Sequence, residues 1–285
     1  MLIPRLLRIN QWIKNLFLFA GIIFSRHYIY RNELITVIFA FLGFSLLTSG
    51  VYIINDLLDL NRDRLHPKKR FRPIASGEVG KNLALSLGII LIIVGNIIAS
   101  LLDGYFFLIT LSYTIMMILY SLILKDFIIL DVFIVAAGYV LRAAGGALVI
   151  GVEISSWLLI CTFLIALFLI MAKRRQELII MATPGDHRQS LSGYSPLLLD
   201  QMISVVTSAT VVSYAFYTLS PQTVTKFKTN NLVFTVPIVI YGIFRYLYIV
   251  YKKTEAGAPE AAVVKDRPLL FTILIWVIAV LIIIR

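Results

Sequence analysis

The sequence predicts an all-α protein that crosses a membrane several times. Of its 285 residues, 60% are hydrophobic and 14% are charged, and the mean hydropathy is +0.92. This composition excludes a soluble domain of the same size, which would need a more polar surface. The apolar runs are about 20 residues long, the length of a membrane-spanning helix. They lack the alternation of a transmembrane β-barrel, so helices are the expected spanning structure.

Nine apolar runs are candidate membrane spans. They cover approximately residues 12–28, 34–54, 82–102, 105–124, 128–150, 155–172, 198–219, 231–251 and 268–284. Lysine and arginine predict the orientation, because cytoplasmic loops carry an excess of both. With the N-terminus inside, 19 of these residues fall in cytoplasmic segments and 5 in outer segments. We therefore expect a multi-pass protein of the inner (cytoplasmic) membrane, with a cytoplasmic N-terminus and an outer C-terminus.

The net charge of +11 does not indicate a nucleic-acid-binding protein, because the basic residues are dispersed over the loops between spans. Membrane topology and anionic ligands explain them better. The single cysteine, Cys161, lies in an apolar run and excludes an internal disulfide. His66 and His187 each lack a second ligand at zinc-like spacing, so no zinc site is expected.

Residues 55–77, NDLLDLNRDRLHPKKRFRPIASG, carry the densest charge in the chain. Asp56, Asp59 and Asp63 have the spacing i, i+3, i+7, which places three carboxylates on one face of a helix. Carboxylates held so close repel one another unless a cation lies among them. Mg²⁺ is the candidate, because it binds one or two carboxylates and leaves positions for phosphate oxygens. The three aspartates are therefore the predicted metal ligands and catalytic residues.

A basic cluster follows the acidic residues. Lys68, Lys69, Arg70 and Arg72 come after Pro67, which ends the helix. Such a cluster suits phosphate oxygens, so the whole stretch predicts a site for a diphosphate substrate. The alternative is a solvated cytoplasmic loop that only follows membrane topology, but topology does not require aspartates.

Two basic residues, both arginines, are not counted for the orientation because they fall within predicted spans. Arg142 lies within a long apolar run, where a charge is costly and normally faces a polar cavity or partner. We expect it to be functional or part of a buried network. Gly145 and Gly146 beside it favour the close approach of another helix. Arg245 lies near the end of a span, where snorkelling to the interface is the expected explanation.

A second polar cluster follows the sixth span in the segment KRRQELIIMATPGDHRQSLSGYSP. Lys173 and Glu177 are an i, i+4 pair beside Arg174, and Arg188 and Tyr194 follow. We expect a second polar site that faces the first one, although an ordinary positively charged loop is the alternative.

Smaller clues come from residues at the predicted inner ends of other spans. Lys14 begins the first span, where it either reaches phosphate or anchors the helix. Tyr120 and Lys125, with Asp126 and Asp131 beyond them, are candidates to line the same cavity as the acidic residues. Interfacial tyrosine and lysine are also common in membrane proteins without a site.

Several motifs resemble those of known proteins. NDxxDxxxDR followed by HPxKRxRPIAxG is similar to the first signature of UbiA-type intramembrane prenyltransferases. QWIKNLFLFAG, YSLILKDFIILDVFIVAAGYVLRAAGGA, MAKRRQEL, and FRYLYIVYKK with KDRPLL resemble the decaprenyl-phosphate phosphoribosyltransferase branch. The resemblance runs from about residue 8 to the final span. It implies a single domain over residues 1–285, with nine helices around a central cavity.

The resemblance also implies a reaction and roles for residues. The branch joins a polyprenyl phosphate to 5-phosphoribose 1-diphosphate and releases diphosphate. Asp56, Asp59 and Asp63 would hold Mg²⁺ and the diphosphate, and Asn55 would orient it. The residues that would contact phosphates are Arg64, Lys69, Arg70 and Arg72 in the first loop, and Lys173, Arg174 and Arg188 in the second.

One departure from the family pattern separates the possible reactions. A typical UbiA-type prenyltransferase carries a second aspartate-rich motif after its sixth helix, whereas this chain reads KRRQEL there. A basic second site suits an additional phosphate, which favours phosphoribosyl transfer over prenyl transfer. The alternatives are a prenyltransferase that uses a prenyl diphosphate and, in another class, a transporter. The expected partners are the lipid bilayer and the two substrates, and homo-oligomerisation stays open.

Overall fold

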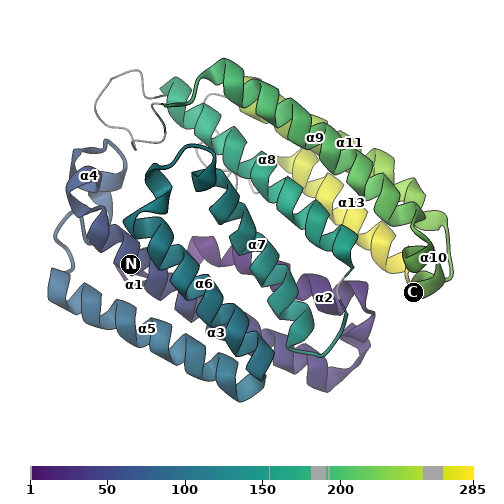
Figure 1. The fold of residues 1–285 in the computed structure, drawn as a ribbon, viewed down its shortest axis with the longest axis horizontal. Coiled ribbons are helices and arrows are strands. Elements are labelled where there is room, and N and C mark those ends of the chain that lie inside the picture. The colour runs from purple at the N-terminus through teal and green to yellow at the C-terminus, as the bar shows by residue number, and fades with distance from the viewer. Residues whose placement is uncertain (1, 154, 181–190, 192, 253–265) are drawn as a thin grey trace. The chain divides into compact units, whose positions relative to one another are not determined.

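The computed structural model describes residues 2–153, 155–180, 191, 193–252 and 266–285, and all of their regular elements are helices (Figure 1). The chain divides into two compact units, which among the described residues comprise 2–153 and the remainder. The first unit contains α1 (Leu2–Leu6), η1 (Ile9–Leu18), α2 (Phe19–Phe24), η2 (His27–Ile29), α3 (Arg31–Leu58), α4 (Leu60–Leu65), η3 (Lys69–Phe71), α5 (Lys81–Leu102), α6 (Gly104–Leu122), η4 (Leu124–Asp126) and α7 (Leu130–Leu148). The second contains α8 (Ser156–Ile180), α9 (Pro196–Leu219), α10 (Pro221–Phe227), η6 (Asn231–Thr235), α11 (Val236–Lys252) and α13 (Arg267–Ile283).

The predicted spans agree closely with these helices, but the number nine is not confirmed. Among the described residues, seven helices are long and apolar enough to cross a membrane. The first and last predicted spans correspond to shorter apolar helices, Ile9–Phe24 and Arg267–Ile283. Most of the first is a 3₁₀ helix, which rises about 2.0 Å per residue instead of about 1.5 Å. Its length therefore approaches the roughly 30 Å of a bilayer core despite its few residues.

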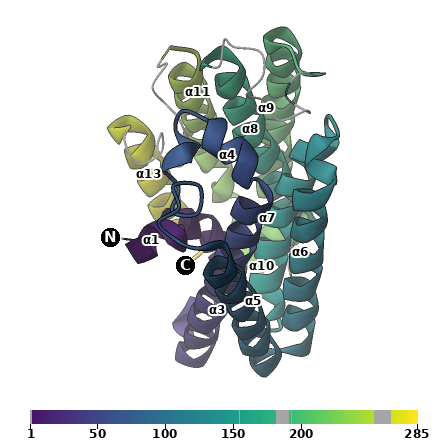
Figure 2. The ribbon, with the colours of Figure 1, turned by 90° about the vertical axis from the view of Figure 1, so that its left-hand side faces the viewer.

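Small residues bring α3 and α5 together side by side (Figures 1 and 2). A Cβ atom on Gly50 of α3 would lie 2.6 Å from the carbonyl oxygen of Gly88 on α5. A Cβ atom on Gly95 of α5 would lie 2.7 Å from the carbonyl oxygen of Gly43 on α3. The pairs run in opposite order along the two helices, so α3 and α5 are antiparallel. Close backbone approach through small residues is typical of helices packed in membranes.

Glycines of α7 allow the N-terminal segment to pack just as closely. A Cβ atom on Gly146 would lie 1.8 Å from the carbonyl oxygen of Leu18 in η1. A Cβ atom on Gly21 in α2 would lie 2.6 Å from the Cα of Ala147. The predicted close approach at this pair of glycines is thus confirmed for Gly146. The approaching segment is the N-terminal one, and it carries Lys14 and Asn15 toward α7.

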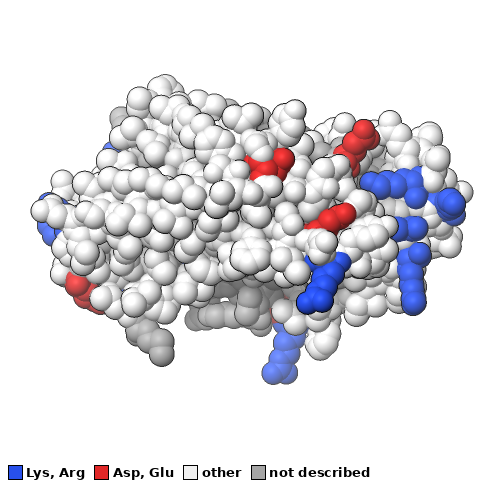
Figure 3. Space-filling view, turned by 90° about the horizontal axis from the view of Figure 1, so that it is seen from below, with Lys and Arg blue, Asp and Glu red and all other residues white. Residues whose placement is uncertain are grey.

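Much of the helical surface is apolar and exposed. Leu83, Leu101 and Tyr105 are more than half exposed. Only 17% of the 18-residue apolar stretch of α5 is buried inside the protein. Figure 3 shows one face on which Lys, Arg, Asp and Glu are few. A soluble protein rarely exposes such large apolar areas, so this surface suits contact with lipid chains.

Polar contacts join different helices of the second unit. Tyr214 on α9 contacts the Thr235 hydroxyl at 2.7 Å and accepts a hydrogen bond from Trp276 Nε1 at 2.9 Å. Asp266 caps α13 and forms two 2.9 Å hydrogen bonds with the guanidinium of Arg245 on α11. The charge of Arg245 is therefore paired with a carboxylate at the start of α13, and the snorkelling expected for Arg245 stays a prediction.

Candidate functional site

The three aspartates lie where α3 passes into α4. Asp56 is in the last turn of α3, Asp59 is the single residue between the helices, and Asp63 is in α4. The backbone pattern is barely interrupted, because Asp59 N–H donates to Asn55 C=O and Asp63 N–H donates to Asp59 C=O. All three acids are buried, with exposed fractions of 6%, 8% and 3%. Buried carboxylates need cationic partners, and each of these has at least one.

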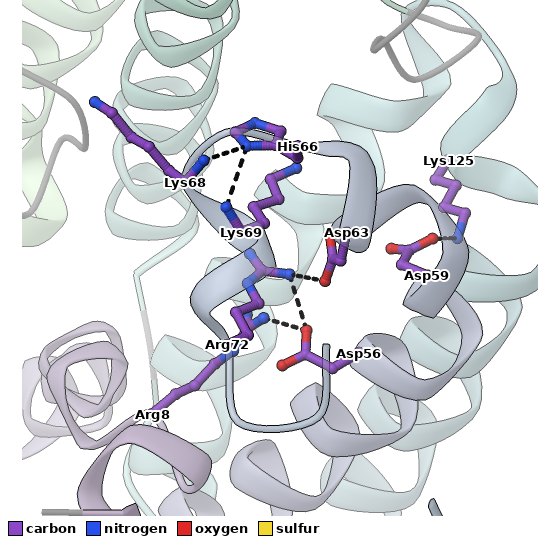
Figure 4. A network of polar contacts seen from close by, with 9 residues as sticks. All are labelled: Arg8, Asp56, Asp59, Asp63, His66, Lys68, Lys69, Arg72 and Lys125. Carbon is purple, nitrogen blue, oxygen red and sulfur yellow. Dashed lines mark hydrogen bonds and ion pairs between the residues drawn. The ribbon is translucent and has the colours of Figure 1, made fainter. Parts of the chain in front are cut away.

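Arg72 bridges two of the acids (Figure 4). Its Nη1 lies 3.0 Å from Asp56 Oδ1 and 2.5 Å from Asp63 Oδ2. Arg72 follows η3 and precedes Pro73, and its extended backbone is the conformation that a following proline favours. Asp56 and Asp63 therefore converge on one cationic nitrogen, in agreement with their predicted common face.

Arg8 is a second cation on Asp56, and in the sequence it is one of the 19 basic residues counted as cytoplasmic for the orientation. Its guanidinium donates to Asp56 Oδ1 and lies 5.1 Å from the centroid of the Tyr52 ring. Its backbone is left-handed, with φ of 51°, which is uncommon for a residue other than glycine. Burial lowers the pKa of the Arg8 guanidinium, and the Asp56 carboxylate opposes this shift. The contact joins residues 48 positions apart, so no local sequence pattern reveals it.

Asp59 binds a different cation. Lys125 in η4 is 4% exposed, and its Nζ lies 2.6 Å from Asp59 Oδ1. The structure thus brings Lys125 to the acidic residues, as the sequence predicted. Tyr120, one helical turn away at the end of α6, is also buried. Asp126 instead points to Arg62, whose Nη1 lies 3.6 Å away.

The loop after α4 is shaped by His66. Its Nδ1 accepts hydrogen bonds from the backbone N–H groups of Lys68 and Lys69, at 3.1 and 3.2 Å. Arg64 donates from Nε to the carbonyl oxygen of Ala75, which fixes the end of the loop. Lys68 and Arg70 are exposed, whereas Lys69 is half-buried. The backbone that carries these basic residues is therefore fixed by local hydrogen bonds, and Arg72 is the residue of the loop that contacts the acids.

Arg142 belongs to a buried polar network within the first unit. It donates from Nε to Asn15 Oδ1 at 2.8 Å and from Nη2 to the Tyr113 hydroxyl at 2.9 Å. Nη1 donates to the carbonyl oxygen of Gly138 at 2.7 Å. These three acceptors are uncharged, and the rings of Phe44, Tyr113 and Tyr139 surround the guanidinium at 4.7–5.4 Å. The predicted buried network is confirmed, and Lys14 lies half-buried next to Asn15.

The second polar cluster lies on a helix, because α8 continues to Ile180, eight residues beyond the predicted span. Glu177 accepts a 2.9 Å hydrogen bond from Arg174, which is 6% exposed, and Lys173 is half-buried. Arg175 forms an ion pair with Asp200 and lies 4.0 Å from the Tyr251 ring centroid. Arg188 lies outside the described residues. That this cluster faces the acids of the first unit stays a prediction.

Mg²⁺ suits the chemistry of the acidic pair. Carboxylate oxygens are its preferred protein ligands, and Asp56 and Asp63 already accommodate one positive group between them. Within the described residues, however, no three acidic, histidine or cysteine side chains are arranged to hold a metal. The expected triad is therefore divided in this structure, since Asp59 turns to Lys125 while the other two share Arg72.

The sequence pattern of the UbiA prenyltransferase family matches residues 16–274. The chain belongs to this family. It is a multi-pass membrane protein of the UbiA fold, and the resemblance predicted from its motifs is confirmed.

Curated relatives of this UbiA-family chain match nearly its whole length. It is 31% identical to decaprenyl-phosphate phosphoribosyltransferase of Mycolicibacterium smegmatis, over 95% of this chain and 88% of that protein. It is 30% identical to the protein of the same name from Corynebacterium glutamicum, over 96% of this chain and 84% of that protein. A UbiA homolog from Archaeoglobus fulgidus, solved bound to GPP and Mg²⁺, has a TM-score of 0.76 at 18% identity. That match covers 100% of this chain and 99% of the homolog, and it shows the fold alone.

Proposed function

We propose that this protein transfers 5-phosphoribose from 5-phosphoribose 1-diphosphate to a polyprenyl phosphate and releases diphosphate. The observation that carries the proposal is the full-length similarity to two decaprenyl-phosphate phosphoribosyltransferases at about 30% identity. The basic segment on α8 supports it. Prenyl transfer is the alternative, and it would be expected to use a second aspartate-rich segment where this chain has KRRQEL. In this proposal, residues 1–285 act as one transferase domain.

The phosphate oxygen of the lipid attacks the anomeric carbon of the ribose. A new C–O bond forms as the bond from that carbon to the diphosphate oxygen breaks, and the diphosphate leaves with the electron pair. The centre inverts through an oxocarbenium-like transition state. The attacking phosphate is already ionised, so the chain does not have to supply a general base.

The chain's own residues position the leaving group and balance its charge. Asp56, Asp59 and Asp63 would hold Mg²⁺, which supplies Lewis-acid stabilisation of the departing diphosphate. Asn55 orients the diphosphate, and the basic residues of the loop after α4 neutralise the negative charge that develops on it. The residues assigned to this task are Arg64, Lys69, Arg70 and Arg72.

A second group of residues is assigned to the remaining phosphates, the 5-phosphate of the donor and the phosphate of the lipid. It comprises Lys14, Tyr120, Lys125 and Arg142 in the first unit, and Lys173, Arg174, Glu177 and Arg188 in the second. Arg142 acts in this proposal by fixing Asn15 and hence the segment that carries Lys14, because its described contacts are internal.

The test is diphosphate release by the purified full-length protein in detergent. Polyprenyl phosphate, 5-phosphoribose 1-diphosphate and Mg²⁺ are supplied together and then omitted one at a time, and the lipid product is identified by mass spectrometry. We expect release to require all three components and to accompany a phosphoribosylated lipid. Activity only with a prenyl diphosphate and an acceptor would establish prenyl transfer instead. No diphosphate release with either donor would contradict both transferases.

The proposed orientation places the reaction at the cytoplasmic face of the inner membrane. Replacing Cys161 by serine gives a background for single cysteines, because it is the chain's one cysteine. Cysteine at exposed Lys68 should react with a membrane-impermeant thiol reagent only in inside-out vesicles. Cysteine at exposed Asn230 should react only in right-side-out vesicles. The reverse pattern would place the acidic site on the outer side.

A further inference from the structure

Three cations already neutralise the three acids of the candidate site. Arg72 contacts Asp56 and Asp63, Arg8 contacts Asp56, and Lys125 contacts Asp59. Among these six side chains the formal charges cancel. A divalent cation that entered alone would give a buried cluster an excess charge of about +2, which is costly away from water. The same cation arriving with a diphosphate would bring compensating negative charge.

Arg72 occupies the position between two carboxylates that a bridging cation would take. One nitrogen, Nη1, contacts both Asp56 Oδ1 and Asp63 Oδ2. A metal cannot bridge these two oxygens while this nitrogen remains between them. Entry of the metal at this position therefore requires Arg72 to leave.

Of the three cations, Arg72 is the one best placed to move. Its side chain is 27% exposed, compared with 20% for Arg8 and 6% for Lys125. It lies in the loop after α4, whereas Lys125 is a buried residue of η4 and Arg8 is held by both Asp56 and the Tyr52 ring. A guanidinium released at this point remains next to the basic loop, where its fork geometry suits phosphate oxygens.

We propose that Arg72 is an exchangeable cation, which holds Asp56 and Asp63 together without substrate and gives up this position when a divalent metal enters with diphosphate. Arg72 then turns from the carboxylates to the diphosphate, so metal and diphosphate bind cooperatively and metal alone binds weakly. The inference rests on the proposed function only for the identity of the donor, because any diphosphate substrate would drive the same exchange.

The test measures Mn²⁺ binding by electron paramagnetic resonance, with purified protein and neither substrate present. We expect Arg72→Gln to tighten Mn²⁺ binding by about tenfold or more, since the metal no longer has to break two charge-assisted hydrogen bonds. The matched control is Arg62→Gln, which removes an equal charge beside Asp63 but leaves Arg72 in place. Its side chain is 53% exposed and pairs with Asp126. Equal affinities for the wild type and Arg72→Gln, or equal gains in both variants, would overturn the proposal.

Thermal unfolding provides a second readout if Arg72→Gln is too unstable to isolate with ease. A ligand that binds the folded state raises its stability in proportion to the logarithm of ligand concentration. Mn²⁺ should therefore raise the melting temperature of Arg72→Gln more than that of the wild type or of Arg62→Gln. If Mn²⁺ does not raise the melting temperature of Arg72→Gln more than that of the wild type, the proposed exchange is contradicted. Neither readout uses a phosphoribosyl donor, so both can be interpreted even if the diphosphate-release assay is negative.

Discussion

The contact between Gly146 and Leu18 predicts that a single methyl group disrupts the packing of the N-terminal segment. In Gly146→Ala, the new Cβ would lie 1.8, 2.5 and 2.7 Å from the carbonyl oxygen, carbon and Cα of Leu18. Ordinary contact begins at 3.4 Å, so the two backbones must separate by about 1.6 Å. The obstacle is backbone, which cannot rotate away as a flexible side chain can.

Neighbouring contacts prevent the segment from sliding aside without further loss. A Cβ at Gly21 would lie 2.6 Å from Ala147, which shows that α2 also packs closely against the next residue of α7. Overpacking normally costs about 1–3 kcal/mol, and backbone contact on both sides places this substitution at about 3 kcal/mol or more. For a protein of this size, that corresponds to a fall of roughly 6 °C or more in melting temperature.

The assay is thermal unfolding in detergent, followed by tryptophan fluorescence. Gly104→Ala is the matched control, because a Cβ atom at Gly104 meets no atom within 4 Å. Its melting temperature should equal or exceed that of the wild type, since alanine favours a helix over glycine by about 1 kcal/mol. Similar melting temperatures for the two alanine variants would refute the packing argument.

Three further predictions concern charged groups of the candidate site. Asp59→Asn should destabilise the protein by about 3–5 kcal/mol in thermal unfolding, because it leaves the buried Lys125 ammonium without its carboxylate. The double variant Asp59→Asn, Lys125→Met should recover most of this loss, and no recovery would refute the pairing. Asp56→Ala should cut diphosphate release severely while the protein stays folded, so a near-normal rate would exclude a metal role for it. Exchanging Lys173 and Arg174 for glutamate should raise the KM for the phosphoribosyl donor, and unchanged donor kinetics would assign both to topology alone.

Hydropathy predicted the helices well because burial in lipid acts on each span separately. The predicted run 82–102 and the helix Lys81–Leu102 differ by one residue. The ends of the helices were harder to predict where polar residues continue a helix. Residues KRRQEL extend α8 beyond its apolar part, and Asp56 belongs to α3 although the predicted span stops at residue 54. Helical hydrogen bonds do not require apolar side chains, so composition alone places such ends too early.

Candidate site residues were predictable where a local pattern or an exceptional environment marked them. The aspartate spacing indicated a shared face for Asp56 and Asp63, and the apolar surroundings of Arg142 indicated a buried network. Ion-pair partners that are distant in sequence are not indicated by any local pattern. Arg8 was counted only as a cytoplasmic basic residue, because its contact with Asp56 depends on the fold. The separate pairing of Asp59 depends likewise on the position of Lys125.

The pairing of Asp59 with Lys125 has a consequence for co-translational folding. These residues are 66 positions apart, and a chain grows by about 5–20 residues per second, so Asp59 waits about 3–13 seconds for its partner to be synthesised. Arg8 precedes Asp56 and is available from the start. We expect the end of α3 to remain at the aqueous boundary during this interval, and to settle into its buried position only after η4 has emerged.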